Sequence, residues 1–240
     1  MFQTDPFALI VVLVGLSLIP FIAMIATSYL KIVVVMSLIR NALGIQSIPP
    51  NMVVNALAMI LTFYIMAPVV SESWTAIVES QKKAKTAAVA AAPAAQAQGK
   101  GAAVQQPATF DLSTLDLTKA GEPFRKFLSD HTAPRERAFF VKTAETLWGK
   151  NDEPAAVDPE SFWILLPSFC VSELTKAFQI GFLVYLPFIA IDIIVSNILL
   201  AMGMMMVSPV TISLPFKLLL FVMVNGWTLL IQGLVKGYIL

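Results

Sequence analysis

The sequence predicts an all-α, membrane-associated protein with two apolar helical hairpins flanking a polar middle segment. Of its 240 residues, 58% are hydrophobic and 13% are charged, and the mean hydropathy is +0.79. Soluble domains usually have about a quarter of their residues charged. The charges are also clustered, because 23 of the 31 Asp, Glu, Lys and Arg residues fall between Ser71 and Ser161. The chain is therefore apolar, polar and apolar in turn, and we expect it to lie in or against a membrane.

The first apolar block, residues 1–70, contains two hydrophobic runs. Phe7 to Ile39 has Pro20 in its middle, and Met52 to Val70 follows after a short connection. Each run is long enough to cross about 30 Å of hydrocarbon, which takes roughly 20 residues in a helix. The opening "MFQTD" has no positive region and no cleavage site follows it, so we expect the first helix to be retained.

The middle segment, residues 71–161, has two parts. Residues 82–109 are Ala, Gln, Gly and Pro with almost no large apolar side chain, which predicts a flexible linker. Beyond it, apolar side chains recur at spacings of three and four, as at Phe124 and Leu128 and again at Phe140 and Leu147. This spacing predicts two amphipathic helices within about 120–150, which cap or dock onto the apolar part. Pro134 falls near the start of the second helix, where proline is tolerated.

The second apolar block, residues 162–240, offers the runs Phe162 to Met202 and Ile212 to Leu240. Pro167 and Pro187 are expected to interrupt the first run.

Between these two runs lie Met204, Met205 and Met206, bounded by Gly203 and by Ser208-Pro209. Three consecutive residues cannot share one helical face, because each step turns about 100°. Gly and Pro on either side predict a loop. The methionines are then either packing at a hairpin tip or, brought together from several subunits, a ring of flexible apolar side chains.

Orientation follows from charge near the first connection. Lys31 and Arg40 flank it without an acid, which by the positive-inside tendency places it in the cytoplasm. The N-terminus and the middle segment would then be extracytoplasmic.

The apolar helices carry more polar groups than lipid tolerates. A charge at the bilayer centre costs about 3 kcal/mol on insertion scales, so we expect these side chains to face a bundle interior, a partner or water. For Lys31 and Lys217 the alternative is that they lie near helix ends and extend to the interface. The polar residues in question are Lys31, Glu173, Lys176, Gln179, Asp192, Asn197, Lys217 and Asn225.

Small residues share one face of the last apolar run. Gly226, Gly233 and Gly237 recur at i, i+7 and i+11, a pattern that allows close helix packing.

Other function classes find little support. There is no HExxH, GxSxG or phosphate-binding loop and no paired carboxylates, so no enzyme is predicted. The near-zero net charge and the absence of a basic stripe exclude a nucleic-acid partner. The single Cys170 and His131 make no metal-ligand set, and no cofactor is implied. We expect Cys170 to be a small buried hydrophobe and His131 a solvated surface residue.

Four strings resemble one family closely. They are "TSYLKIVVVMSLIRNALGIQSIPPN" (27–51), "LTFYIMAPV" (61–69), "GEPFRKFL" in the middle segment and "SELTKAFQIGFLVYLPFIAIDIIVSNILLAMGMMMVSPVTISLPFKLLLFVMVNGW" (172–227). They resemble the SctR/FliP family, the inner-membrane export-apparatus proteins of type III secretion systems and bacterial flagella. The string around residues 30–52 looks nearer the injectisome branch than the flagellar one.

The resemblance implies a non-enzymatic export gate. It implies a homo-oligomer, expected to be a pentamer, with SctS/FliQ-type, SctT/FliR-type and SctU/FlhB-type subunits, through which unfolded proteins cross the inner membrane. It implies that the hairpins pack in an oligomeric cone raised largely above the bilayer lipid. It further implies that the Met run seals the pore. Glu173 has two candidate cations, Lys176 and Lys217, and the resemblance favours Lys217, within the chain or across a subunit boundary near the pore. Asn225 stands where the family usually has Asp, and the Ala/Gln-rich linker is longer than expected.

Two alternatives stay open. A polytopic small-solute transporter or channel subunit would also bury charges in broken helices, although its two halves usually share a break pattern and these do not. A membrane-embedded enzyme would need a nucleophile or metal constellation.

Overall fold

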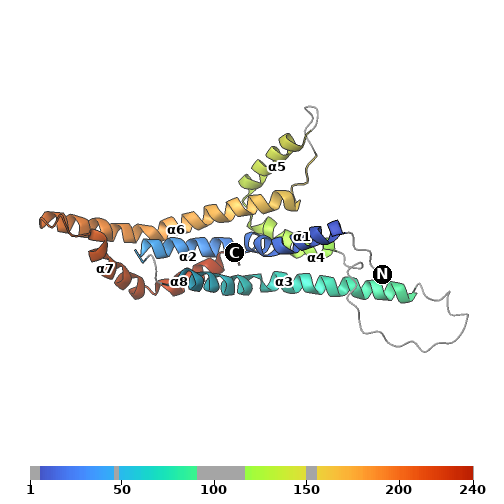
Figure 1. Ribbon diagram of the computed structural model, residues 1–240, viewed down its shortest axis with the longest axis horizontal. Coiled ribbons are helices and arrows are strands. Elements are labelled where there is room, and N and C mark those ends of the chain that lie inside the picture. The colour runs from blue at the N-terminus through green and yellow to red at the C-terminus, as the bar shows by residue number, and fades with distance from the viewer. Residues whose placement is uncertain (1–5, 46–48, 91–116, 150–155, 240) are drawn as a thin grey trace, which may run out of the picture. The chain divides into compact units, whose positions relative to one another are not determined.

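The computed structural model describes residues 6–45, 49–90, 117–149 and 156–239, and every regular element among them is a helix. The expected all-α class is confirmed. Contacts divide the chain into two units, Met1–Met66 with His131–Leu240 and Ala67–Asp130, which we describe separately. The helices are α1 (Pro6–Ile25), α2 (Tyr29–Ala42), α3 (Asn51–Ala90), α4 (Leu117–His131), α5 (Pro134–Trp148), α6 (Phe162–Ala201), α7 (Pro209–Met223) and α8 (Gly226–Lys236), as Figure 1 shows.

The core of the first unit lies between α2 and α6, which run side by side in Figure 1. On α2 the buried apolar residues recur at helical spacing from Ile32 to Ala42. They pack with Val54 and Ala58 of α3, with Ala177 and Phe188 of α6, and with residues of α7 and α8. The apolar periodicity of α2 therefore places this short helix at the centre of the unit.

The first apolar run is broken, but not at Pro20, which lies inside α1. The break falls after Ile25, and the two segments meet at 59°. Its cause is local, because the Thr27 hydroxyl donates to the Ala23 carbonyl at 2.8 Å and accepts from the Tyr29 amide at 3.4 Å. A threonine side chain that takes up backbone groups in this way competes with the helical ladder.

The expected interruption of α6 is wrong. Helix α6 is continuous from Phe162 to Ala201 with both Pro167 and Pro187 inside it. Each proline removes one backbone hydrogen bond. In apolar surroundings no water competes for the rest of the ladder, so a helix tolerates this loss. The unbroken helix carries the chain from α5 to the Met-rich loop.

The last apolar run is also not one helix. It divides into α7 and α8, which meet at 59°. Asn225 stands between them with φ 50°, in the left-handed region. Asn is among the few non-glycine residues that adopt this conformation readily, which gives the residue a backbone role in the turn.

Helix α3 corrects the expected start of the linker at residue 82, and it continues through the expected block boundary at residue 70. This helix runs to Ala90 with Pro68 inside it, so residues 82–90 are helical. Alanine and lysine have high helix propensity, and they continue the helix where large apolar side chains are absent. Residues 91–109, the rest of the predicted linker, lie outside the described residues.

The two predicted amphipathic helices are present as α4 and α5. Helix α4 carries Phe127 and Leu128 as buried residues, and α5 begins at Pro134. In the first unit, the Ala133 amide before α5 donates to the Ser172 hydroxyl on α6 at 2.9 Å. The start of α5 is thereby fixed to α6.

Among the residues that the structure describes, two helices are long and apolar enough to cross a membrane, Asn51–Lys82 within α3 and α6 itself. The bent pairs α1 with α2 and α7 with α8 pass the same test when each pair is taken as one span, which gives up to four. Only small parts of these windows are buried inside the chain. Their apolar surface is therefore left for lipid or other subunits.

Candidate functional site

The Met-rich loop joins α6 to α7 and is defined here as Gly203 to Ser208. Gly203 has φ 73° and ends α6, and its amide bonds to the Leu200 carbonyl while the Met204 amide bonds to the Leu199 carbonyl. These two bonds form a Schellman cap, which glycine favours because it has no Cβ to strain. The predicted loop is confirmed. Pro209 then begins α7.

The three methionines of this loop are partly or fully exposed. Met204, Met205 and Met206 are 47%, 81% and 101% exposed. The backbone bonds of the loop are short-range, such as those from the Met205 amide to the Gly203 carbonyl and from the Val207 amide to the Met204 carbonyl. Met205 and Met206 therefore make little contact at the tip of their own hairpin, whereas about half of Met204 is covered, and the sealing role of the three stays a prediction.

A buried charge cluster lies around Glu173, whose side chain has 0% exposure. Lys31 of α2 contacts its Oε2 at 3.0 Å, and Lys176, one turn along α6, contacts Oε1 at 3.0 Å. The Tyr238 hydroxyl donates to the same carboxylate, and the Lys31 Nζ lies 3.6 Å from the centre of the Tyr238 ring. Glu173 therefore joins α2, α6 and the chain that follows α8.

The residues around this cluster keep the Tyr238 hydroxyl protonated and hold Lys176 and His131 in place. Burial, and next the negative charge of Glu173, raise the pKa of Tyr238, so its hydroxyl remains a donor. Lys176 also donates to the His131 carbonyl at 2.7 Å. The His131 ring packs on the Tyr238 ring with centroids 5.1 Å apart. The interpretation of His131 as a purely solvated residue is therefore corrected, because it is half-buried against the cluster.

The expected pair of Glu173 with Lys217 is wrong within the chain. Lys217 contacts Asp192 Oδ2 at 2.6 Å and donates to the Ala42 carbonyl at 3.3 Å. Neither Lys31 nor Lys217 extends to an interface, because their side chains are only 3% and 5% exposed. Within the chain Lys31, Glu173 and Lys217 are buried, whereas Lys176 and Asp192 keep part of their surface open. The role of these charges in assembly stays a prediction.

The three glycines of the last run have different surroundings. A Cβ on Gly226 would lie 2.3 Å from the Phe221 ring, so α7 and α8 meet closely there. A Cβ on Gly233 would meet nothing within 4 Å, and one on Gly237 only carbonyls of its own helix. Close packing within the chain thus holds for Gly226 alone. The role of Gly233 and Gly237 in helix packing stays a prediction.

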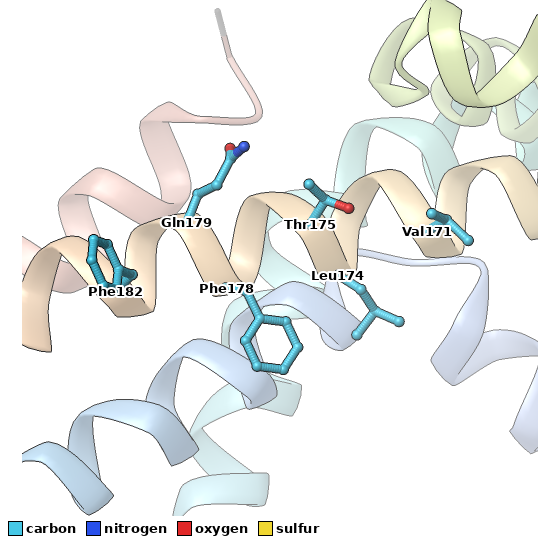
Figure 2. A pocket seen from close by; sticks show the side chains of 6 residues that line it. All are labelled: Val171, Leu174, Thr175, Phe178, Gln179 and Phe182. Atoms are coloured by element: carbon cyan, nitrogen blue, oxygen red, sulfur yellow. The ribbon is translucent and has the colours of Figure 1, made fainter.

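An open groove of about 510 Å³ follows one face of α6. Six side chains of α6 line it, as Figure 2 shows. Phe178 and Phe182 are 58% and 62% exposed. A groove lined by one helix holds no set of converging polar groups, so it does not resemble a small-molecule site. Among the described residues, no three His, Cys, Asp or Glu side chains are grouped as metal ligands.

Sequence reasoning missed Tyr238, Ser213 and the Ala42 carbonyl as parts of the charge clusters. Each lies far along the chain from its partner. A hydroxyl or a backbone carbonyl gives no charge signal in a sequence, and only packing brings it to the ion pair. Cys170, expected to be buried, is partly exposed, and its Sγ lies 3.9 Å from the Ile25 carbonyl.

Comparison with known proteins identifies the family. The model of the FliP family matches residues 12–234. The chain belongs to the FliP family. It is 47% identical to the Yop proteins translocation protein R of Yersinia pestis, over 98% of this chain and 97% of that protein. It is 43% identical to the virulence protein YscR of Salmonella typhimurium, over 98% and 97%.

A flagellar relative is less similar to this chain than these two are. Identity to the flagellar biosynthetic protein FliP of Bacillus subtilis is 38%, over 96% of this chain and 90% of that protein. This FliP-family chain therefore lies on the injectisome branch, and the resemblance found in its motifs is confirmed.

Proposed function

We propose that this chain is a core subunit of a type III secretion export gate in the bacterial inner membrane. In this role it forms, with partner subunits, the pore through which unfolded proteins cross. Support comes from its membership of the FliP family and from two relatives whose names describe translocation and virulence proteins. The apolar helices long enough to span a membrane agree with this location. The role is structural, and no catalytic step is assigned to the chain.

The observation that carries the pore assignment is the exposure of Met204, Met205 and Met206 at the end of the α6–α7 hairpin. Against the residues that the structure describes, Met205 and Met206 are largely exposed and Met204 is about half exposed. Repeated around a ring, they would bury one another and exclude water and ions. Methionine suits this task because its side chain is unbranched and flexible, so it can close without a fixed register and part around any polypeptide.

The gate is assembled from several chains. We infer a homo-oligomer, expected to be a pentamer, with SctS/FliQ-type, SctT/FliR-type and SctU/FlhB-type subunits. The apolar groove on α6 and the open surface at Gly233 support further contacts, because the described residues cover neither of them. A monomer would have to expose both to lipid or water.

The middle segment is assigned to the periplasm. This orientation rests on the positive-inside tendency of the α2–α3 connection. Since Lys31 is buried in an ion pair, Arg40 alone carries that argument. Its guanidinium donates to the Pro49 carbonyl and to Asn51 Oδ1, so it stays at the connection.

The test is a triple variant, Met204→Ala with Met205→Ala and Met206→Ala. We expect an assembled complex whose membranes conduct small ions at matched expression, because alanine cannot fill the pore. The matched control replaces three exposed methionines outside the loop, Met52, Met59 and Met223, which are 81%, 44% and 73% exposed. We expect this control to remain impermeable. An assembled triple-alanine loop as impermeable as the wild type would overturn the seal.

Co-purification separates the gate from the alternative of a small-solute transporter. Extraction in mild detergent should recover a large complex of several different chains. Recovery of a monomer or dimer that transports a solute would instead favour the transporter.

A further inference from the structure

Helix α7 has an unusual buried face. Its buried residues are Ser213, Lys217 and Phe221, which recur every fourth position and so form one stripe. Two of the three are polar. A helix that packs through polar residues needs partners for them, because an unpaired polar group away from water is costly.

Asp192 of α6 is the partner of both polar residues, one through each carboxylate oxygen. The Ser213 hydroxyl donates to Oδ1 at 2.6 Å, and Lys217 Nζ contacts Oδ2 at 2.6 Å. The Ser213 hydroxyl also lies 3.1 Å from the Val210 carbonyl, one turn back toward the loop. Two successive turns of α7 are thus joined to one residue of α6.

The third residue of the stripe makes the apolar part of the same contact. The Phe221 ring packs against Phe188, with centroids 6.4 Å apart. Phe188 lies one turn before Asp192 on α6, as Phe221 lies one turn after Lys217 on α7. The aromatic pair and the polar pair therefore specify the same antiparallel register.

Lys217 extends this contact to a third helix. Its Nζ donates to the carbonyl of Ala42, the last residue of α2. The final carbonyls of a helix lack helical partners and carry partial negative charge, which favours a cation. Through Lys217 the hairpin is held to α2 as well as to itself.

The position of α7 determines the position of the Met-rich loop, because the backbone hydrogen bonds described for that loop are all short-range. In lipid no hydrophobic force drives one helix against another, and packing and hydrogen bonds decide the arrangement. The bonds of Asp192 and the contact of Phe188 with Phe221 together therefore set the direction of α7.

We propose that Asp192, acting through Ser213 and Lys217, is a positioning residue that holds α7 on α6 and α2 and so fixes where the Met-rich loop is presented. This inference rests on the proposed sealing function of the loop. Asp192 itself does not touch the transported chain.

The experiment measures position and leakage separately in the assembled complex. In a Cys170→Ser background, spin labels replace Asn41 at the end of α2 and Val210 at the start of α7, both exposed. One labelled subunit is assembled among unlabelled ones, and the distance between the two labels is measured by electron spin resonance. Ion conductance is measured on the same variants without labels.

We expect one narrow distance peak in the parent and loss of that peak in Asp192→Asn, together with ion leakage. Ser213→Ala should broaden the peak less, because one of the two bonds remains. The exchange Asp192→Lys with Lys217→Asp should restore the narrow peak only in part, because an aspartate at position 217 cannot donate to the Ala42 carbonyl. The control is Asn197→Ala, an exposed residue of α6 whose side chain makes no bond to the described residues, and it should change neither measurement.

The outcomes separate this proposal from the seal itself. Broad distances in Asp192→Asn together with impermeable membranes in both this variant and the triple-alanine loop would support positioning and overturn the seal. A narrow peak in Asp192→Asn would overturn the positioning role, whether or not the membranes leak.

Discussion

Replacing Glu173 by Gln tests whether the cluster around it stabilises the chain. The change keeps the size of the side chain and removes its charge. Lys31, 3% exposed, then loses its counterion and is left buried beside the second cation, Lys176. Removing one partner of a buried ion pair costs about 3–5 kcal/mol, so we expect the free energy of unfolding to fall by about that amount.

The other partners of Glu173 should give a graded series. Tyr238→Phe keeps the ring beneath the Lys31 ammonium and loses only the hydroxyl donor, which costs about 1.5–3 kcal/mol for a bond to a charged group. Lys176→Gln should cost at most about 1 kcal/mol, because that side chain is 39% exposed and solvent screens its pair.

The assay is unfolding of the purified chain in mixed micelles, followed by circular dichroism as denaturing detergent increases. The double variant Glu173→Gln with Lys31→Met removes both buried charges. It should be more stable than Glu173→Gln alone, because an apolar side chain tolerates that site better than an unpaired cation. If Glu173→Gln costs less than about 1 kcal/mol, or if the double variant is the less stable of the two, the reasoning is refuted.

Two further predictions use the packing and the linker. Gly181→Ala should destabilise the chain by up to about 3 kcal/mol, because its Cβ would lie 2.3 Å from Leu38 Cδ1 and 3.2 Å from Leu38 Cβ. In contrast, the Cβ of Gly233→Ala meets open space, so this variant should gain up to about 1 kcal/mol of stability from helix propensity. Thermal unfolding compares the two, and equal effects would contradict the α2–α6 packing. Shortening residues 91–108 by about ten residues should leave assembly and secretion intact, because closure entropy changes slowly with loop length. Loss of the complex on that deletion would show that the segment is a structured contact.

The sequence alone determined the order of apolar and polar blocks, the helical class and the family. These follow from local properties. Hydropathy is an average over a run of residues, so it predicts the apolar and polar blocks. Gly203 and Ser208-Pro209 act on the backbone next to them, so the Met-rich loop was also predictable. The burial of Lys31, Glu173 and Lys217 was also predictable, because a charge in an apolar helix needs a polar environment.

Only the tertiary structure decided which charge pairs with which. Glu173 had candidate cations of similar character at several positions, and sequence distance does not rank them. The packing of α2 along α6 brings Lys31 to Glu173, and the return of α7 along α6 brings Lys217 to Asp192. Continuity through Pro167 and Pro187 was likewise not a local matter, because whether a helix continues through a proline depends on how its surroundings satisfy the freed backbone groups. The composition of an apolar helix predicts that a charge within it needs a partner. Which residue is the partner depends on the register of two packed helices, and the sequence of one helix alone does not determine that register.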